Sequence, residues 1–483
     1  MHVEDQQPAP RAGAQVSAER AIPEGPTLAL ACLATALAMV MFTMPMSTLV
    51  DLAHLLNANV TQRTWMLAAA SVGLGAGLLV GGALADRLGR RTVFMTGAAV
   101  QAVFLFVSVS WPSPILFTVA RVGQGLGAAA LIATSLGLIA QVTPQAGHRR
   151  TRATGIWGAS LGCGILIGPL LTALLGPATG WRVPYLIVGV LSLALIAFAR
   201  VLPANPAHSA VFHGRIDYLA AACLVLGPSL LLAGLTLGRS GWTQPAVLVL
   251  LVAGLLVLAV FAIHETRTAA PLVDIQLFTN PHFVTVTVAA FAAGLGVIAL
   301  TSYTPILVDQ GMHGSALAGA VPIVVWSGVS VVVAVLARHL RRWISADAQL
   351  AIGLVVTGAG LAVLGPLHGG DTLVRLLPGF AIAGLGTGLL NAALGGQAVA
   401  TVPAHHASMG SGTNNTARYL GSGLGVAIVT STVDPTSAST LLRSWETPIL
   451  FGSAVSVLIG IAIPIYLRAA TRHTRVQAQT LAP

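Results

Sequence analysis

The chain has 483 residues, of which 55% are hydrophobic and 8% are charged. A soluble domain carries about 25% charged residues, so this composition excludes a soluble globular protein and predicts an all-α polytopic membrane protein. The formal net charge is +10, and every basic residue other than histidine is arginine. In a membrane protein such an excess marks cytoplasmic loops, so we expect no nucleic-acid partner.

A helix that spans a bilayer needs about 20 mostly apolar residues. Fourteen segments meet this requirement, and glycine, proline or charged residues separate them. In chain order they are 27–49, 64–84, 92–111, 114–136, 154–175, 183–201, 217–237, 245–263, 283–306, 316–337, 349–367, 374–397, 408–431 and 448–467. The polar ends, 1–26 and 468–483, are predicted to be cytoplasmic tails, the first of them disordered.

Arginines gather at alternate ends of these segments, and the positive-inside rule assigns such ends to the cytoplasm. We therefore expect a multi-pass plasma-membrane protein with both termini inside. The use of arginine to the exclusion of lysine indicates a bacterial, GC-rich genome. The main groups are Arg87/Arg90/Arg91, Arg149/Arg150/Arg152, Arg338/Arg341/Arg342 and Arg468/Arg472/Arg475.

The first of these groups belongs to GALADRLGRR, a charged turn between the second and third spans. A basic loop of this kind could simply set topology. The spacing G-x-L-x-D-R-x-G-R-R, however, resembles the loop between helices 2 and 3 of the major facilitator superfamily of secondary transporters. The resemblance implies a conformational switch in which arginines pair with the aspartate in one state. The residues concerned are Gly82, Asp86, Arg87, Gly89, Arg90 and Arg91.

The fourth span carries Arg121 in its outer half, with Gln124 three residues later on the same face. An arginine within a span is costly and is by default a candidate functional residue. Its pattern, R-x-x-Q-G-x-G, resembles the helix-4 motif of facilitator antiporters, which implies a role in proton handling. The alternative is an arginine that extends to the outer headgroups.

The fifth span contains glycines spaced four apart, among them Gly164 and Gly168, followed by Pro169. Such spacing predicts a close helix–helix seam and a kink. It resembles the helix-5 motif that marks exporters of the superfamily, although Thr172 and Ala173 stand where the family usually has two glycines. Ordinary transmembrane packing is the alternative.

The thirteenth span contains GSGTNNTARYLGSGLGVAI. This segment is similar to the pattern of the same helix in the 14-helix drug:proton antiporter branch, the group of quaternary-ammonium and multidrug exporters. We expect Arg418 there to have Asn414 and Asn415 within reach, either for function or as a structural tie. The resemblance implies a six-helix bundle in 27–201, a linker with two extra helices in 202–282 and a second bundle in 283–467.

The chain departs from that branch in its first span, where the family's usual aspartate falls on Met41. No acidic residue lies at the centre of a predicted span, so Asp309 and Asp51, near span ends, are the acidic candidates for proton coupling beside Arg121. Two arginines within spans, without acids, favour a neutral or anionic substrate.

We therefore expect an exporter of a small organic compound, a drug or a secondary metabolite, driven by the proton motive force without a cofactor or metal. The chain is expected to be a monomer and not an enzyme. Alternatives are a nutrient importer or facilitator, and a scaffold or sensor on the same fold. Candidates for the cavity wall are Gln124, Trp157, Met44, Met46, Tyr303, Trp326, Asn391, Asn415 and Arg418.

Overall fold

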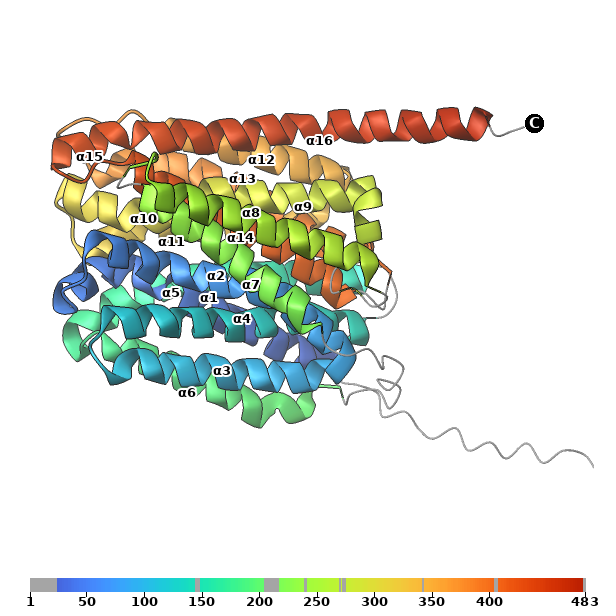
Figure 1. Ribbon diagram of the computed structural model, residues 1–483, viewed down its shortest axis with the longest axis horizontal. Coiled ribbons are helices and arrows are strands. Elements are labelled where there is room, and N and C mark those ends of the chain that lie inside the picture. Colours follow the sequence, from blue (N-terminus) through green and yellow to red (C-terminus); the bar gives the residue numbers. More distant parts are fainter. Residues whose placement is uncertain are drawn as a thin grey trace, which may run out of the picture.

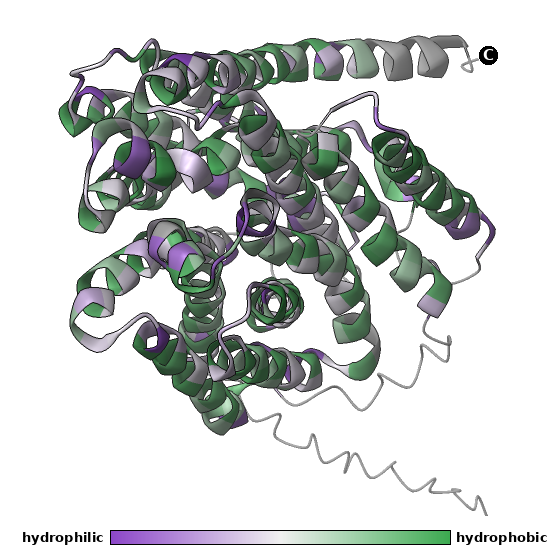
Figure 2. Cartoon of the chain, turned by 60° about the vertical axis from the view of Figure 1, so that its left-hand side comes forward, coloured by the Kyte–Doolittle hydropathy of each residue, from purple (hydrophilic) through white to green (hydrophobic). Residues whose placement is uncertain are grey.

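The computed structural model describes residues 24–143, 148–203, 217–238, 241–268, 271, 275–340, 343–403 and 407–480. The expected tail over 1–23 and part of the expected linker, 204–216, lie outside these residues. Regular structure within them is helical, and the helices lie side by side along one direction (Figure 1). Hydrophobic residues dominate their lengths, and hydrophilic residues gather at loops and helix ends (Figure 2).

Six helices form a first bundle, two follow alone, and the remainder form a second bundle. The first bundle contains α1 (Glu24–Leu55), α2 (Val60–Leu88), α3 (Arg90–Ser110), α4 (Pro114–Val142), α5 (His148–Thr179) and α6 (Arg182–Phe198). The pair is α7 (Tyr218–Gly238) and α8 (Pro245–Arg267). The second bundle contains α9 (Pro281–Ala293), α10 (Ala299–Ile306), α11 (Ala316–Leu340), α12 (Ala346–Val363), α13 (Leu377–Ala400), α14 (Ala407–Thr432), α15 (Ala438–Ser444) and α16 (Glu446–Thr480).

Several helices are longer than the sequence predicts, and two of these extensions affect the description of the chain. α9 and α10 form one continuous helical span from Pro281 to Gly311, because the π-helical turns η4 (Gly294–Ile298) and η5 (Leu307–Gly311) join and extend them. Asp309 is therefore part of the last helical turn. α16 continues to Thr480 and projects beyond the bundle (Figure 1).

Thirteen helical segments among the described residues are long and apolar enough to cross a membrane. The remaining expected span, 408–431, forms α14, which is too polar to meet that criterion but is buried along almost its whole length. It packs between α2 of the first bundle and α9 and α13 of the second. Neighbouring helices therefore take the place of lipid around its polar side chains, so the low hydropathy of α14 is consistent with a span inside the protein.

The two bundles meet along α2–α14 and α5–α11. Thr416 of α14 donates a hydrogen bond of 3.0 Å to the backbone oxygen of Gly75 in α2. The extra pair lies against this junction, where α7 packs on α2 and α14, and α8 packs on α7. His264 and Asp217, 2.6 Å apart, tie the ends of that pair together.

The seam between α1 and α5 is the closest packing within the first bundle that involves a predicted motif. A Cβ on Gly168 would overlap the hydroxyl of Thr43, and one on Gly164 would overlap the backbone oxygen of Ala36. The two glycines therefore let α5 approach the backbone of α1 directly. Beside them, Ser47 of α1 donates to the backbone oxygen of Pro169 over 3.1 Å.

We predict that Gly164→Ala and Gly168→Ala each lower the midpoint of thermal unfolding of the purified protein. The added methyl group meets backbone or a short side chain that cannot yield, and overpacking of this kind typically costs about 1–3 kcal/mol. Gly155→Ala, in the same helix with open space around the new Cβ, is the matched control. Equal stability of all three variants would contradict the interpretation that Gly164 and Gly168 are needed for the close approach of α5 to α1.

Candidate functional site

A small cavity lies between the two bundles, at the level of the centre of α1. Its volume is about 10 Å³, close to the space that one water molecule needs, so the space between the bundles is closed here. Side chains from α1, α5, η4, α10, α11 and α14 line it: Met39, Phe42, Thr43, Met46, Ile165, Ile298, Thr301, Trp326, Arg418 and Tyr419.

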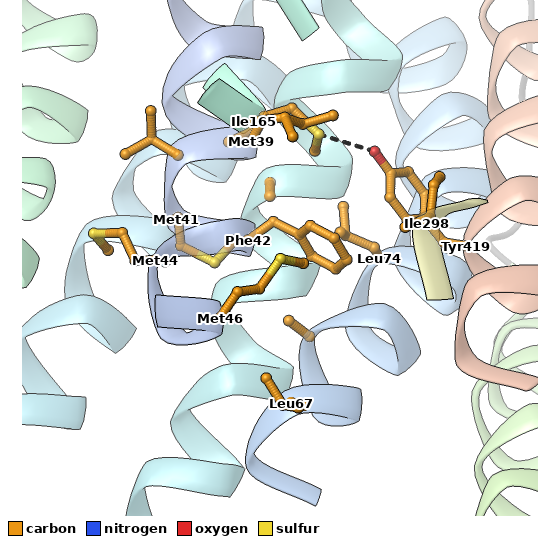
Figure 3. Close-up of a cluster of buried hydrophobic side chains, with 14 of the residues drawn as sticks. Met39, Met41, Phe42, Met44, Met46, Leu67, Leu74, Ile165, Ile298 and Tyr419 are labelled. Atoms are coloured by element: carbon orange, nitrogen blue, oxygen red, sulfur yellow. Dashed lines mark hydrogen bonds between the residues drawn. The ribbon is translucent and has the colours of Figure 1, made fainter. Parts of the chain in front are cut away.

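Tyr419 of α14 lines the cavity and points toward Met39 and Phe42 of α1 (Figure 3). Its hydroxyl lies 3.1 Å from the sulfur of Met39, and its ring meets that of Phe42 edge-on, with centroids 5.6 Å apart. These contacts join the two bundles through a thioether and an aromatic ring, which form weak, adaptable interactions. The sequence interpretation did not include Tyr419, since nothing in its own span shows which helix it faces.

Arg418 is the one charged side chain among the residues that line this cavity. It is 4% exposed, and its Nη1 donates to Oδ1 of Asn391 in α13 over 3.1 Å. The expectation that Asn414 and Asn415 accept from it was wrong. Their amide groups donate instead to the backbone oxygens of Val286 and Ser411, so the partner of Arg418 comes from another helix.

Arg121 lies behind α1, away from this cavity, and is 1% exposed. Its Nη1 donates to the backbone oxygen of Met41 over 2.7 Å and to Oε1 of Gln124 over 3.1 Å. Its Nη2 donates to the backbone oxygen of Phe42 over 2.8 Å. Gln124 in turn donates to the backbone oxygen of Phe104 in α3. The guanidinium therefore ties α1, α3 and α4 together, with neutral oxygens as its hydrogen-bond acceptors.

The sequence of α1 explains why a carbonyl is free to accept at this point. Pro45 stands inside the helix, and proline has no N–H to donate to the carbonyl four residues earlier, which is that of Met41. Arg121 supplies the missing donor. The position at which the family carries an aspartate thus contributes a backbone oxygen, exposed by the proline, in place of a carboxylate.

Of the other cavity candidates, Met46 and Trp326 line the closed cavity, and Trp157, Met44 and Tyr303 are not among its lining residues. Trp157 donates to the hydroxyl of Thr35 over 2.9 Å, and Tyr303 stacks on Trp445. Met44 is fully buried, and Trp326 donates to Thr387 over 3.1 Å while lining the cavity. Whether these side chains contact substrate in a wider state of the cavity stays a prediction.

The charged turn after α2 is tight, because only one residue, Gly89, separates α2 from α3. Gly89 has a φ of 94°, which favours glycine. Arg90 follows at once and donates to the backbone oxygen of Gly137 in α4 over 2.6 Å. The side chains of Asp86 and Arg87 lie outside the described residues, so the predicted pairing within the turn stays a prediction.

At the opposite end, Asp51 of α1 and Asp309 of η5 lie close enough to interact electrostatically, although they belong to different bundles. His54 and His313 are also close enough to Asp309 to interact with it electrostatically. The sequence analysis selected the two aspartates and missed the two histidines. Histidines near span ends on the outer side were the signal that could have found them.

Comparison with known proteins places these features in a family. A model of the Major Facilitator Superfamily matches residues 31–426. The probable actinorhodin transporter of Streptomyces coelicolor is 31% identical over 379 residues, which are 76% of this chain and 64% of that protein. The puromycin resistance protein pur8 of Streptomyces alboniger is 29% identical, over 80% of this chain and 77% of its own length.

Further comparisons agree. The multidrug resistance protein Stp of Mycobacterium tuberculosis is 28% identical, over 78% of this chain and 70% of its own length. The crystal structure of the human organic anion transporter MFSD10 (TETRAN) shares the fold, with a TM-score of 0.62 at 16% identity, over 91% of this chain and 99% of that one. The chain therefore belongs to the Major Facilitator Superfamily, a family of membrane transporters and not of enzymes, as its resemblance to the 14-helix drug:proton antiporters predicted.

Proposed function

We propose that this protein is a proton-driven exporter of a small organic compound across a bacterial plasma membrane, with both termini in the cytoplasm. The observation that carries the proposal is the closed, mostly apolar cavity between the two bundles, with a single arginine in its wall. Alternating access around a site between two repeats is the general mechanism of such folds. Export is supported by relatives that are named for antibiotic transport and for drug resistance.

The cavity favours a neutral or anionic substrate. Arg418 faces it, and the other lining residues are uncharged. A cationic compound would meet an unpaired positive charge in a low dielectric, which is costly. An anionic or hydrogen-bond-accepting compound would instead accept from the guanidinium, which already donates to Asn391.

Proton coupling is assigned to the outer mouth. Asp51 and Asp309 approach each other from different bundles, so their protonation can respond to the relative movement of those bundles. Arg121, in contrast, cannot lose its proton under working conditions. Its buried contacts with Met41 and Phe42 support a positioning role on α1.

We predict that Arg121→Ala abolishes export while the protein still inserts in the membrane. The substitution leaves the carbonyl of Met41 without a donor, and a buried unsatisfied carbonyl costs about 1–3 kcal/mol. Arg121→Lys should restore little of the export activity, since a single ammonium group cannot donate to both backbone oxygens with the geometry of a guanidinium. Export is measured in cells after matched membrane expression, with the exposed Arg443→Gln as control. Normal export by Arg121→Ala would contradict the proposal that Arg121 positions α1.

We predict that Asp309→Asn or Asp51→Asn uncouples transport from protons. Substrate-driven proton release from proteoliposomes should fall at least about tenfold in one of them, because the amide cannot titrate. Asp371→Asn, in the loop between α12 and α13, is the matched control. If coupling survives in both variants and in the double variant, the proton site lies elsewhere.

The direction of transport is tested with everted membrane vesicles. A susceptibility panel on cells that lack or overexpress the gene first identifies a compound. An exporter should then accumulate that compound in everted vesicles when the interior is acidified, and lose the activity with a protonophore. Accumulation confined to right-side-out vesicles would favour an importer instead.

A further inference from the structure

A second cavity lies in the first bundle, at the arginine-rich end that the positive-inside rule assigns to the cytoplasm. The beginnings of α1 and α5 and the end of α4 enclose it, and its volume is about 240 Å³. It is separate from the cavity between the bundles and shares no lining residue with it. We propose that it binds the headgroup of an anionic phospholipid of the cytoplasmic leaflet.

The rim of this cavity is basic. Arg149 and Arg152 line it beside Glu24, whose carboxylate lies 3.5 Å from Arg149. Among the described residues, Arg152 has no ion pair. Arg150, next to Arg149 in α5, adds a further positive charge to this end of the helix; burial lowers its pKa, and Arg90 lowers it further. An anion at the rim would interact favourably with this group of arginines.

The walls one helical turn deeper are apolar. Leu28 follows Glu24 by four residues in α1, and Ile156 follows Arg152 by four in α5. Residues four apart share one face of a helix, so on both helices a charged side chain at the rim stands over an apolar one. This order matches a phospholipid, whose phosphate lies at the interface and whose chains lie below it.

Exposed apolar side chains recur on one face of α5 from the cavity toward the membrane centre. Ile156 is 37% exposed, and Ile167 and Leu174, on the same face, are 43% and 56% exposed. Between Ile156 and Ile167 this face carries the buried Ser160 and the half-buried Cys163. A free phosphate or a short anion would leave the exposed apolar side chains uncovered. Basic pockets at the cytoplasmic ends of spanning helices are suited to anionic lipid headgroups, and these apolar side chains offer contacts for an acyl chain.

The test is native mass spectrometry of the full-length protein in mild detergent, titrated with phosphatidylglycerol or with zwitterionic phosphatidylethanolamine. We expect phosphatidylglycerol to bind more tightly. Arg152→Gln should weaken it about fivefold, the contribution of one arginine near a membrane surface. Ala153→Leu, which fills the cavity without changing charge, should weaken it as well. Arg468→Gln, an exposed arginine on α16, is the matched control and should bind as the parent does.

Three outcomes would overturn the proposal. The first is unchanged phosphatidylglycerol binding in both Arg152→Gln and Ala153→Leu, and the second is an equal loss in Arg468→Gln. The third is displacement of the lipid by millimolar inorganic phosphate, which would make the cavity a site for a free anion. Thermal unfolding checks that each variant is folded, and Arg152→Gln, which changes an exposed side chain, remains informative if Ala153→Leu does not fold. The readout needs no transport, so it does not depend on the proposed export activity.

Discussion

The first bundle depends on one buried cation that is held by neutral oxygens. Arg121 is surrounded by α1, α3 and α4, and its strongest partner is a carbonyl that Pro45 leaves without an internal donor. A buried charge without such acceptors would be expensive, and a proline inside α1 without such a donor would leave a buried carbonyl unsatisfied. The hydrogen bond from Arg121 to Met41 therefore gives the buried guanidinium an acceptor and the free carbonyl a donor. The face of α1 opposite this tie is the one that lines the central cavity, so the tie sets which side chains face the substrate pathway.

This arrangement separates the parts that must stay together from the parts that must move. The glycine seam holds α5 against the backbone of α1, so these two helices are suited to move as one body. Contacts between the bundles include the packing of α14 on α2 and of α11 on α5, together with the interaction of Tyr419 with Met39 and the hydrogen bond from Thr416 to Gly75. Rocking of one bundle against the other would have to slide or separate these surfaces.

Much of this architecture could be predicted from the sequence. Apolar runs predicted the spans, because hydropathy reports the lipid environment directly, and the prediction included 408–431, although α14 there is more polar than the other spans. Local spacing also selected Gly164 and Gly168. What could not be predicted was the partner across helices. Asn391 reaches Arg418 from α13, and the proline-freed carbonyl of Met41 meets Arg121 from α1, since helix rotation and depth decide such pairs and neither is encoded by local periodicity.

The carbonyl of Met41 also bears on where the proposed proton coupling can lie. A carbonyl can accept hydrogen bonds from a guanidinium but cannot gain or lose a proton, so the first span has no titrating group at that position. The outer pair proposed for this role, Asp51 and Asp309, consists of carboxyl groups from different bundles. When both are ionised they repel, which favours separation of the bundles on the outer side; a proton taken from outside removes the repulsion and favours closure. Binding of the proton would then drive the chain toward the state that opens inward, which is the order of steps that an exporter needs.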